Sequence, residues 1–398
     1  MKRKKYDVVV IGAGPAGSLC ARNLAQKGYT VLLAEKRPIV GIPVRCGEAT
    51  GPRKRLSDFT PINESFIETD IHGVVLHGPG NISIKYDKKD IGLMLDRGLF
   101  DQDLAKQAEA AGAELCLEAR ISDIKKVANE TRELRIVYQG QEESIEASMV
   151  IGADGAEALS GRWVGLKSRQ LPPHVCSAIE FRLEAKDENP NHLTFWQGHE
   201  SLNRGYVWVF PKVKSKVVNL GAGIITPKMG EKNMYDLTME FKEKYFPNAK
   251  LLEVHGGAVP VSGTLEDYVD DRFVLVGDAA HHTNPMTGGG IMASLCAADF
   301  ASIWIDKAFK AGDFSKAFFK QYEQAAWNRF GRNHERERKI RDFILGLNTD
   351  KQIQFYKIFK SMSASDFKGL PKYLGYARLL GLGAQNWGLV KKSFFTAK

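Results

Sequence analysis

The sequence predicts a mixed α/β fold, α+β overall, in which a domain built on a parallel sheet is interleaved with a β-rich domain and followed by C-terminal helices. Three observations predict this fold. A β-α-β pattern opens the chain, alternating apolar and polar residues dominate from Ser177 to about Pro260, and the chain beyond Gly290 has mainly helical patterns. The 398 residues suffice for about two domains.

The β-α-β unit occupies the first 34 residues. Val8–Ile11 and Thr30–Ala34 are predicted strands, and Ala16–Lys27 is a predicted amphipathic helix with Gly28 just past its end. Apolar residues fill both strands without alternation, which is typical of strands that are covered on both faces of a parallel sheet. The chain therefore opens as a nucleotide-binding domain does.

A glycine-rich turn lies between the first strand and the helix. Gly12-Ala-Gly14-Pro-Ala16-Gly17 fits GxGxxG, in which glycines allow a tight turn and let a pyrophosphate approach the helix N-terminus. Glu35 ends the second strand, where a carboxylate can accept hydrogen bonds from ribose hydroxyls. A Rossmann-like dinucleotide-binding domain follows, and a purely structural glycine turn is the alternative.

Further elements are predicted along the rest of the chain. A helix is expected at Arg97–Ala111, and strands at Gly73–Leu76, Ile82–Tyr86, Gly92–Leu95, Glu114–Leu117, Ile121–Val127, Arg132–Tyr138, Ser144–Val150 and Phe273–Val276. The expected nucleotide-binding domain comprises residues 1–70, 97–165 and 265–310, the β-rich substrate domain residues 71–96 and 166–264, and a C-terminal helical region residues 311–398.

Two acidic motifs identify the dinucleotide. Gly277-Asp278 ends a strand and is followed by Pro285 and the run Gly288-Gly289-Gly290, as in the GD motif of p-hydroxybenzoate hydroxylase-like flavoproteins, and Asp154-Gly155 resembles their DG motif. Such an Asp can bind ribityl hydroxyls, and the N–H groups of the glycine run can face a flavin ring. FAD is therefore the expected cofactor. One alternative is that Asp154 only caps a turn. Another is that His281 and His282 are packed side chains without a catalytic role.

Three segments resemble motifs of the geranylgeranyl reductase family. Pro43–Glu48 resembles its PxRCGE segment, Tyr206–Pro211 its YxWxFP motif, followed by Gly221-Ala-Gly223, and Leu95–Asp101 its ERxxFD segment. The similarity covers roughly residues 5–300, with Asp96 in place of the usual Glu and a longer spacing between Pro211 and the Gly-x-Gly. The resemblance implies a p-hydroxybenzoate hydroxylase-like fold and an FAD-dependent enzyme that saturates C=C bonds of isoprenoid chains.

The residues themselves suggest how such a reaction would proceed. In a strand, Tyr206, Trp208 and Phe210 share one face and form an aromatic wall for an elongated apolar substrate, with core packing as the alternative. Reducing an alkene needs a hydride and a proton. Cys46 and Tyr206 are the predicted catalytic residues, and Arg45 beside Cys46 would favour its thiolate, although Cys46 is alternatively a small buried apolar residue.

The predicted cofactor contacts combine these segments with the family resemblance. They are Gly12, Gly14, Ala16, Gly17, Glu35, Lys36, Arg45, Cys46, Arg97, Asp154, Gly277, Asp278, Pro285, Gly288, Gly289 and Gly290.

Other functions on the same scaffold stay open. An aromatic hydroxylase or halogenase, or a non-catalytic flavin redox sensor, would share the FAD motifs. A halogenase is disfavoured because Tyr206 and Phe210 stand where its WxWxIP motif has Trp and Ile. Gly381–Asn386 does not follow a strand, so a second dinucleotide fold is not expected. The electron donor would be external, either NAD(P)H or ferredoxin.

Cysteine usage and charge suggest the setting. Five scattered cysteines without CxxC spacing favour a reducing, cytoplasmic compartment and no metal site. The net charge is +9, and from Ala301 onward 19 Lys or Arg face 8 Asp or Glu. Lys351–Lys398 mixes nine basic residues with apolar segments such as Gln354–Phe359 and Tyr373–Leu382. We expect this tail to rest on an anionic membrane, with inward helix packing as the rival interpretation, and we expect no nucleic-acid partner.

Overall fold

The protein is described by a computed structural model that divides into two compact units. The described residues are 1–127, 131–169, 171, 174–198, 202, 204–225 and 233–361. The first unit comprises Met1–Ile67, Leu95–Val175 and Val259–Glu335, and the second comprises Glu68–Met94, Cys176–Ala258 and Arg336–Lys398. The chain thus passes repeatedly from one unit to the other, and the described part of the expected C-terminal helical region, residues 311–361, is divided between the two.

A parallel sheet forms the centre of the first unit. Strand β1 (Lys5–Ile11) lies between β2 (Val31–Ala34) and β9 (Gln141–Gly152), and all three run parallel. Next to β9 lies β16 (Phe273–Leu275), also parallel, and beyond β2 lies β6 (Glu114–Cys116). The side chains of β1 and β2 are almost all buried, as their uninterrupted apolar sequences predict.

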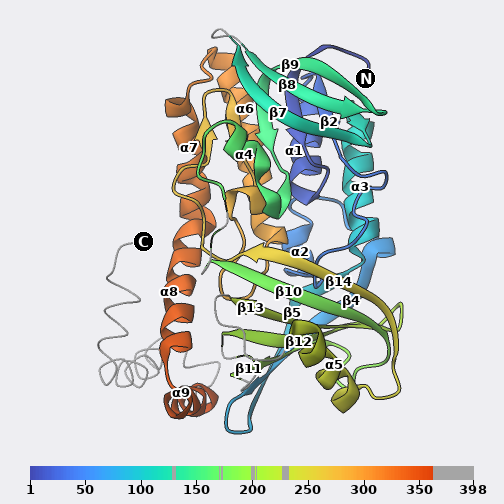
Figure 1. Ribbon diagram of the computed structural model, residues 1–398, viewed down its shortest axis with the longest axis vertical. Helices are drawn as coiled ribbons and strands as arrows, with labels where there is room; N and C mark the ends of the chain where they lie inside the picture. Colours follow the sequence, from blue (N-terminus) through green and yellow to red (C-terminus); the bar gives the residue numbers. More distant parts are fainter. Residues whose placement is uncertain are drawn as a thin grey trace. The chain divides into compact units, whose positions relative to one another are not determined.

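Helices of the first unit pack beside this sheet (Figure 1). Helix α1 (Pro15–Ala25) contacts both α3 (Arg97–Ala110) and α6 (Ile291–Ala311). Small buried residues on α1, among them Ala21 and Cys20, allow the close approach, and the Cys20 thiol lies 3.5 Å from the Ala298 carbonyl oxygen on α6. Three segments far apart in the sequence therefore form one layer.

An antiparallel extension completes the first sheet. Strands β7 (Ala119–Val127) and β8 (Thr131–Tyr138) pair with each other, and β8 pairs with β9. The remaining strand is β15 (Val269–Asp270), which forms a hairpin with β16. Short elements complete the unit: β3 (Ala49–Thr50), α2 (Arg53–Leu56), α4 (Leu159–Trp163), and the 3-10 turns Glu64–Phe66, Gly155–Glu157 and Gly277–Ala280.

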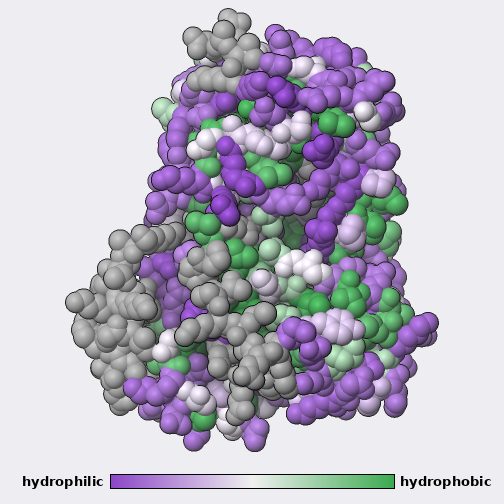
Figure 2. All heavy atoms as spheres, viewed as in Figure 1, coloured by the Kyte–Doolittle hydropathy of each residue, from purple (hydrophilic) through white to green (hydrophobic). Residues whose placement is uncertain are grey.

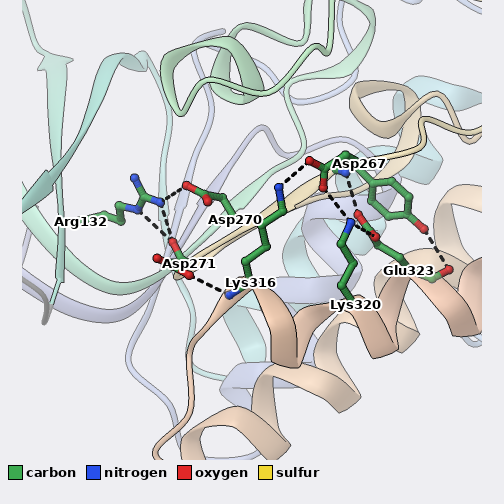
Figure 3. Close-up of polar contacts among 8 residues, drawn as sticks. Arg132, Asp267, Asp270, Asp271, Lys316, Lys320 and Glu323 are labelled. Carbon is green, nitrogen blue, oxygen red and sulfur yellow. Dashed lines mark hydrogen bonds and ion pairs between the residues drawn. The ribbon is translucent and has the colours of Figure 1, made fainter.

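A polar network connects strand β8 with helix α7 (Lys316–Ala326) through the β15–β16 hairpin (Figure 3). The buried guanidinium of Arg132 donates to the Asp270 carboxylate at 2.6 Å and to the Asp271 carbonyl oxygen at 2.6 and 3.1 Å. The Asp271 carboxylate accepts from the backbone N–H of Lys316 at the start of α7. Two lysines of α7 complete the network through Asp267, and Glu323 accepts from the Tyr268 N–H at 2.8 Å. The network therefore fixes the hairpin that leads into Gly277-Asp278.

The second unit is a largely antiparallel sheet. Its strands follow the order β14-β10-β13-β12-β11-β4-β5. Their bounds are β4 (Ile67–Gly78), β5 (Ile82–Leu95), β10 (Val175–Glu184), β11 (His192–Gln197), β12 (Gly205–Lys212), β13 (Val217–Ile225) and β14 (Lys250–Pro260). The two short strands predicted at Ile82–Tyr86 and Gly92–Leu95 are one continuous strand.

One helix interrupts the region that the sequence predicted as β-rich. Helix α5 (Met234–Tyr245) lies between β13 and β14, and its Leu237 and Phe241 pack with Phe181 of β10 and Val207 of β12 in one apolar cluster. Strong alternation on both sides concealed this helix in the sequence. Helix α5 covers the face of the sheet that carries Phe181 and Val207. Residues that alternate with these two along their strands point to the other face.

The end of the described chain is helical, as expected. A π-helical turn at Trp327–Gly331 joins α7 to α8 (Arg332–Gly346), and α9 (Thr349–Ser361) follows. The segment Gln354–Phe359 lies in α9, whereas Tyr373–Leu382 lies outside the described residues. Among the helices that are described, none is at once long and apolar enough to cross a membrane. In the face drawn in Figure 2, hydrophilic residues cover most of the surface and hydrophobic residues form smaller groups.

Two buried histidines lie beside the π-helical turn. His282 is fully buried, with Phe330 and Tyr268 packed edge-on against its ring, and Phe330 also contacts His334. Burial lowers the pKa of the His334 imidazole from 6.5 to about 4 and places that of His282 well below its ordinary range. Both imidazoles are therefore neutral at pH 7.

We expect the buried histidines to make folding stability fall on acidification. The unfolded chain takes up a proton on each imidazole below about pH 6.5, whereas folded His334 does so only near its lowered pKa of about 4, so stability is present above pH 6.5 and is lost as the pH falls. His334 alone should remove about 2 kcal/mol from the free energy of unfolding between about pH 7 and pH 5. Urea unfolding at several pH values measures this.

Two variants separate titration from packing. His334→Gln should flatten the pH dependence, whereas Phe330→Leu, which only opens a gap beside the ring, should lower stability by a similar amount at every pH. An unchanged pH dependence in His334→Gln would contradict the prediction.

Candidate active site

The predicted nucleotide motifs meet at one edge of the first sheet. Strands β1, β2, β9 and β16 are parallel, so their carboxyl ends point the same way. The glycine turn follows β1, Glu35 follows β2, Asp154 follows β9 and Asp278 follows β16. Ligands of open parallel sheets bind outside this edge. The fold therefore brings together residues that are more than 240 positions apart in the sequence.

Backbone contacts explain the glycines of the turn. Gly12 has a φ of +102°, and a Cβ there would lie 2.5 Å from the Ala153 carbonyl oxygen. A Cβ at Gly17 would lie 1.9 Å from the Gly12 carbonyl oxygen. At Gly14 the corresponding position meets no described atom within 4 Å. Gly12 and Gly17 therefore close the turn, while Gly14 leaves space in front of it.

The N-termini of two helices can accept negative charge. Within the described chain, no side chain caps α1 at Gly14 or α6 at Gly290, and neither helix has an acidic residue in its first turn. Both ends thus present backbone N–H groups and the positive end of the helix dipole. An uncapped helix start beside the space at Gly14 fits a pyrophosphate, and the one at Gly290 fits the carbonyl edge of a flavin.

Glu35 holds the glycine turn against β2. One carboxylate oxygen accepts the Ala13 N–H at 2.9 Å and the other accepts the Arg37 N–H at 3.0 Å. Each oxygen keeps capacity for a further hydrogen bond, which suits a ribose hydroxyl. The adjacent Lys36 forms an exposed ion pair with Glu157 at 2.7 Å.

The two aspartates of the FAD motifs have different partners. Asp154 accepts from both the N–H and the hydroxyl of Ser160, at 2.8 and 2.6 Å, and so satisfies a backbone donor in the first turn of α4. Asp278 accepts from the Thr283 hydroxyl at 2.9 Å and lies beside Gly290. Burial raises the pKa of both carboxyls, and the hydrogen bonds from Ser160 and Thr283 oppose that effect.

Cys46 lies among charged groups of the first unit. Its sulfur accepts the Glu48 N–H at 3.3 Å, and it interacts with the guanidinium of Arg97. Burial alone would lower the pKa of Arg97, but Asp101 and Cys46 outweigh it and raise that pKa. Arg97 binds Asp101 through two hydrogen bonds of 2.8 and 2.9 Å. Arg97 is thus a cation that faces Cys46, whereas the sequence suggested Arg45, whose side chain is exposed.

The aromatic wall belongs to the second unit. Tyr206, Trp208 and Phe210 alternate along β12, and Phe195 of the neighbouring β11 contacts both Tyr206 and Phe210 edge-on. Trp208 and Phe210 are buried and Tyr206 is half-buried. Burial raises the pKa of the Tyr206 phenol, so this group stays protonated at neutral pH. These rings lie on the sheet face opposite helix α5.

Residues missed by the sequence analysis complete this face. Phe195 and Glu180 were missed because their strands contain no recognisable motif. Helices α8 and α9 also reach the same face: the Tyr356 hydroxyl donates to Gln197, the residue that pairs with Tyr206, and Arg341 lies near Cys176. Nothing in the loose C-terminal pattern indicated these contacts.

Comparisons with known proteins identify the family of the chain. The family described as geranylgeranyl reductase catalytic domain matches residues 174–259, and an FAD-binding domain family matches residues 5–193. A digeranylgeranylglycerophospholipid reductase of Methanosarcina mazei is 37% identical over 331 residues, covering 82% of this chain and 81% of that one. The enzyme of the same name from Methanothrix thermoacetophila is 33% identical and covers 93% and 96%.

Solved structures agree as well. A geranylgeranyl bacteriochlorophyll reductase-like protein from Thermoplasma acidophilum superimposes with a TM-score of 0.86 at 29% identity, covering 98% of both chains. A p-nitrophenol 4-monooxygenase from Pseudomonas putida gives 0.73 at 14% identity over 98% of this chain and 99% of that one, which shows the shared fold alone. The expected p-hydroxybenzoate hydroxylase-like fold and FAD cofactor are thereby confirmed. From its motifs, its fold and these relatives, the chain belongs to the geranylgeranyl reductase family of FAD-dependent oxidoreductases.

Proposed function

We propose that this protein saturates the C=C bonds of geranylgeranyl chains carried by a glycerophospholipid. Membership of the reductase family supports the reaction, and the relatives named digeranylgeranylglycerophospholipid reductase support the choice of lipid. The aromatic wall is the structural observation that supports the proposal, because its four largely apolar rings contact one another along β11 and β12.

The first unit would hold FAD, which in its reduced form supplies a hydride to one alkene carbon. The α1 N-terminus at Gly14 would bind the pyrophosphate, Glu35 the ribose and Asp278 the ribityl chain. The N–H groups at the start of α6 would face the flavin ring. These contacts need mainly backbone groups, which is why glycine occupies so many of the positions.

The chain itself must deliver the proton for the second alkene carbon. The Cys46 thiol is the proposed donor: its S–H bond breaks, a C–H bond forms, and the thiolate that remains is stabilised by Arg97 and the Glu48 N–H. Solvent then restores the thiol proton. Tyr206 is the second proposed donor, and burial raises the pKa of its phenol, which makes it a weaker acid than an exposed tyrosine.

Membrane contact and an external electron donor belong to the same proposal. A phospholipid substrate resides in a bilayer, so the enzyme must reach the inner face of the membrane. The basic tail Lys351–Lys398 supports an electrostatic contact, because each Lys or Arg near an anionic surface contributes about 1 kcal/mol. NAD(P)H or ferredoxin would bring the electrons from the cytoplasm.

The first test is direct turnover. We expect the dithionite-reduced, FAD-loaded enzyme to add two mass units per bond to digeranylgeranylglycerophospholipid, measured by mass spectrometry of the extracted lipid. Anaerobic turnover excludes the hydroxylase alternative, which needs oxygen. Turnover only in air, with a gain of about 16 mass units for one inserted oxygen, would reject the reductase proposal.

A second test addresses Cys46. Cys46→Ser and Cys46→Ala should retain FAD and slow alkene reduction by roughly 10²-fold, the typical effect of losing a general acid. Stopped-flow reoxidation of the reduced enzyme by lipid measures the step. The control is Cys116→Ser, at a buried thiol on β6 that faces Glu114 instead of Arg97. Equal rates in all three variants would return Cys46 to a packing role.

A third test addresses the membrane. Co-sedimentation with liposomes should require anionic lipid and weaken with added salt, because the attraction is screened over about 10 Å at 0.1 M ionic strength. Charge reversal at Lys391 and Lys392 should reduce binding, whereas reversal of Lys4 and Lys5 at the other terminus should not. Protein that stays in the supernatant with acidic vesicles at low salt would rule out this contact.

A further inference from the structure

We infer that Glu180 is a positioning residue for the reductase: its buried carboxylate holds the Trp208 indole in the one orientation that makes the aromatic wall continuous. The inference rests on the proposed function for its substrate. Neither the sequence motifs nor the family comparisons point to Glu180.

The three residues concerned lie in one row across the sheet. In the strand register, Trp208 of β12 is opposite Gly221 of β13, and Gly221 is opposite Glu180 of β10. Directly opposite residues place their side chains on the same face of a sheet. The row therefore has a large ring at one side, an empty position in the middle and a carboxylate at the other side.

The empty position lets the indole lie across strand β13. A Cβ at Gly221 would be 2.1 Å from the six-membered ring of Trp208, and one at Gly223 would be 3.6 Å from it. No side chain larger than hydrogen fits under the ring at Gly221. This contact explains Gly221, the first glycine of the Gly-x-Gly that follows the YxWxFP motif, because the antiparallel register places it opposite Trp208.

The carboxylate fixes the far edge of the ring. The Trp208 Nε1–H donates to a Glu180 oxygen at 3.2 Å, and both side chains are buried. A buried indole that loses its acceptor is left with an unsatisfied donor, which costs free energy. Loss of the acceptor therefore releases the ring from Gly221 toward the space that an isoprenoid chain would occupy.

The neighbouring rings depend on this orientation. Trp208 contacts Tyr206 and Phe210 at centroid distances of 5.8 and 6.1 Å, and Phe195 is opposite Trp208 in the strand register. A displaced indole interrupts the wall at its centre. The expected consequence is weaker binding of the lipid, with little change in the cofactor site of the first unit.

The experiment compares two variants at Glu180. Glu180→Leu removes the acceptor, and Glu180→Gln keeps an acceptor oxygen without the charge. We expect Glu180→Leu to raise the KM for digeranylgeranylglycerophospholipid roughly tenfold with a smaller change in kcat, and Glu180→Gln to stay within about threefold of the parent. FAD content should be unchanged in both. If Glu180→Leu does not fold, Gly221→Ala displaces the same ring from below and replaces it in the test.

A second readout does not need turnover. In protein labelled with ¹⁵N at tryptophan, the Trp208 indole N–H resonance, assigned by its absence in Trp208→Phe, should move in Glu180→Leu and remain near its position in Glu180→Gln. In a Trp208→Phe background, Glu180→Leu should add no further rise in KM, because the donor is already gone.

The outcomes separate this inference from the proposed function. Unchanged KM and an unchanged indole resonance in Glu180→Leu overturn the positioning role. A further loss in the Trp208→Phe background also overturns it, since Glu180 then acts by another route. The parent enzyme could fail to reduce the lipid while the indole resonance still moves in Glu180→Leu and stays in place in Glu180→Gln. That result rejects the proposed function and leaves the Glu180–Trp208 contact supported.

Discussion

The cofactor site depends on one close approach of backbone to backbone. The turn after β1 brings Gly12 against Ala153, the residue after β9, and brings Gly17 against Gly12. A Cβ at Gly12 would lie 2.5 Å from the Ala153 carbonyl oxygen, and one at Gly17 would lie 1.9 Å from the Gly12 carbonyl oxygen. Because of this approach, α1 starts directly at the strand ends and its N–H groups face the ligand edge. Glu35 and Ala153 then have fixed neighbours. The remaining motifs reach the same edge of the sheet because each of them follows the end of a parallel strand.

This constraint explains why so much of the first unit could be predicted. The glycines that permit the close approach form a recognisable sequence motif, and a fully buried parallel strand has an uninterrupted apolar sequence. For these reasons β1, α1 and β2 were predicted within a few residues. Asp96 departs from the Glu usual in the family, yet its shorter side chain accepts the Leu99 N–H at 2.9 Å and caps α3. The departure is thus compatible with the local structure.

The parts that were not predicted depend on contacts between distant strands. Helix α5 was hidden because the strands around it dominate the local pattern. Arg97 lies 51 positions after Cys46, and only the packing of the loop against the start of α3 brings the two together. No local sequence pattern marks Glu180, because its contact with Trp208 depends on the strand register across β13. Sequence motifs therefore indicated the expected cofactor contacts. They did not indicate the contact of Arg97 with Cys46 or that of Glu180 with Trp208.

Cys46 and the aromatic wall each have a neighbour that is held by a buried carboxylate. Asp101 binds Arg97 through two hydrogen bonds and so keeps the guanidinium beside Cys46, and Glu180 orients Trp208 in the same way. Such carboxylates are costly to bury, and each is retained where a charged or polar partner needs one fixed orientation. Removing either carboxylate leaves its partner buried and unsatisfied, which costs more than the lost contact. Loss of Asp101 should therefore alter the acidity at Cys46, and loss of Glu180 should alter the shape of the wall. Under the proposed function, the two carboxylates would thus act separately on proton transfer and on lipid binding.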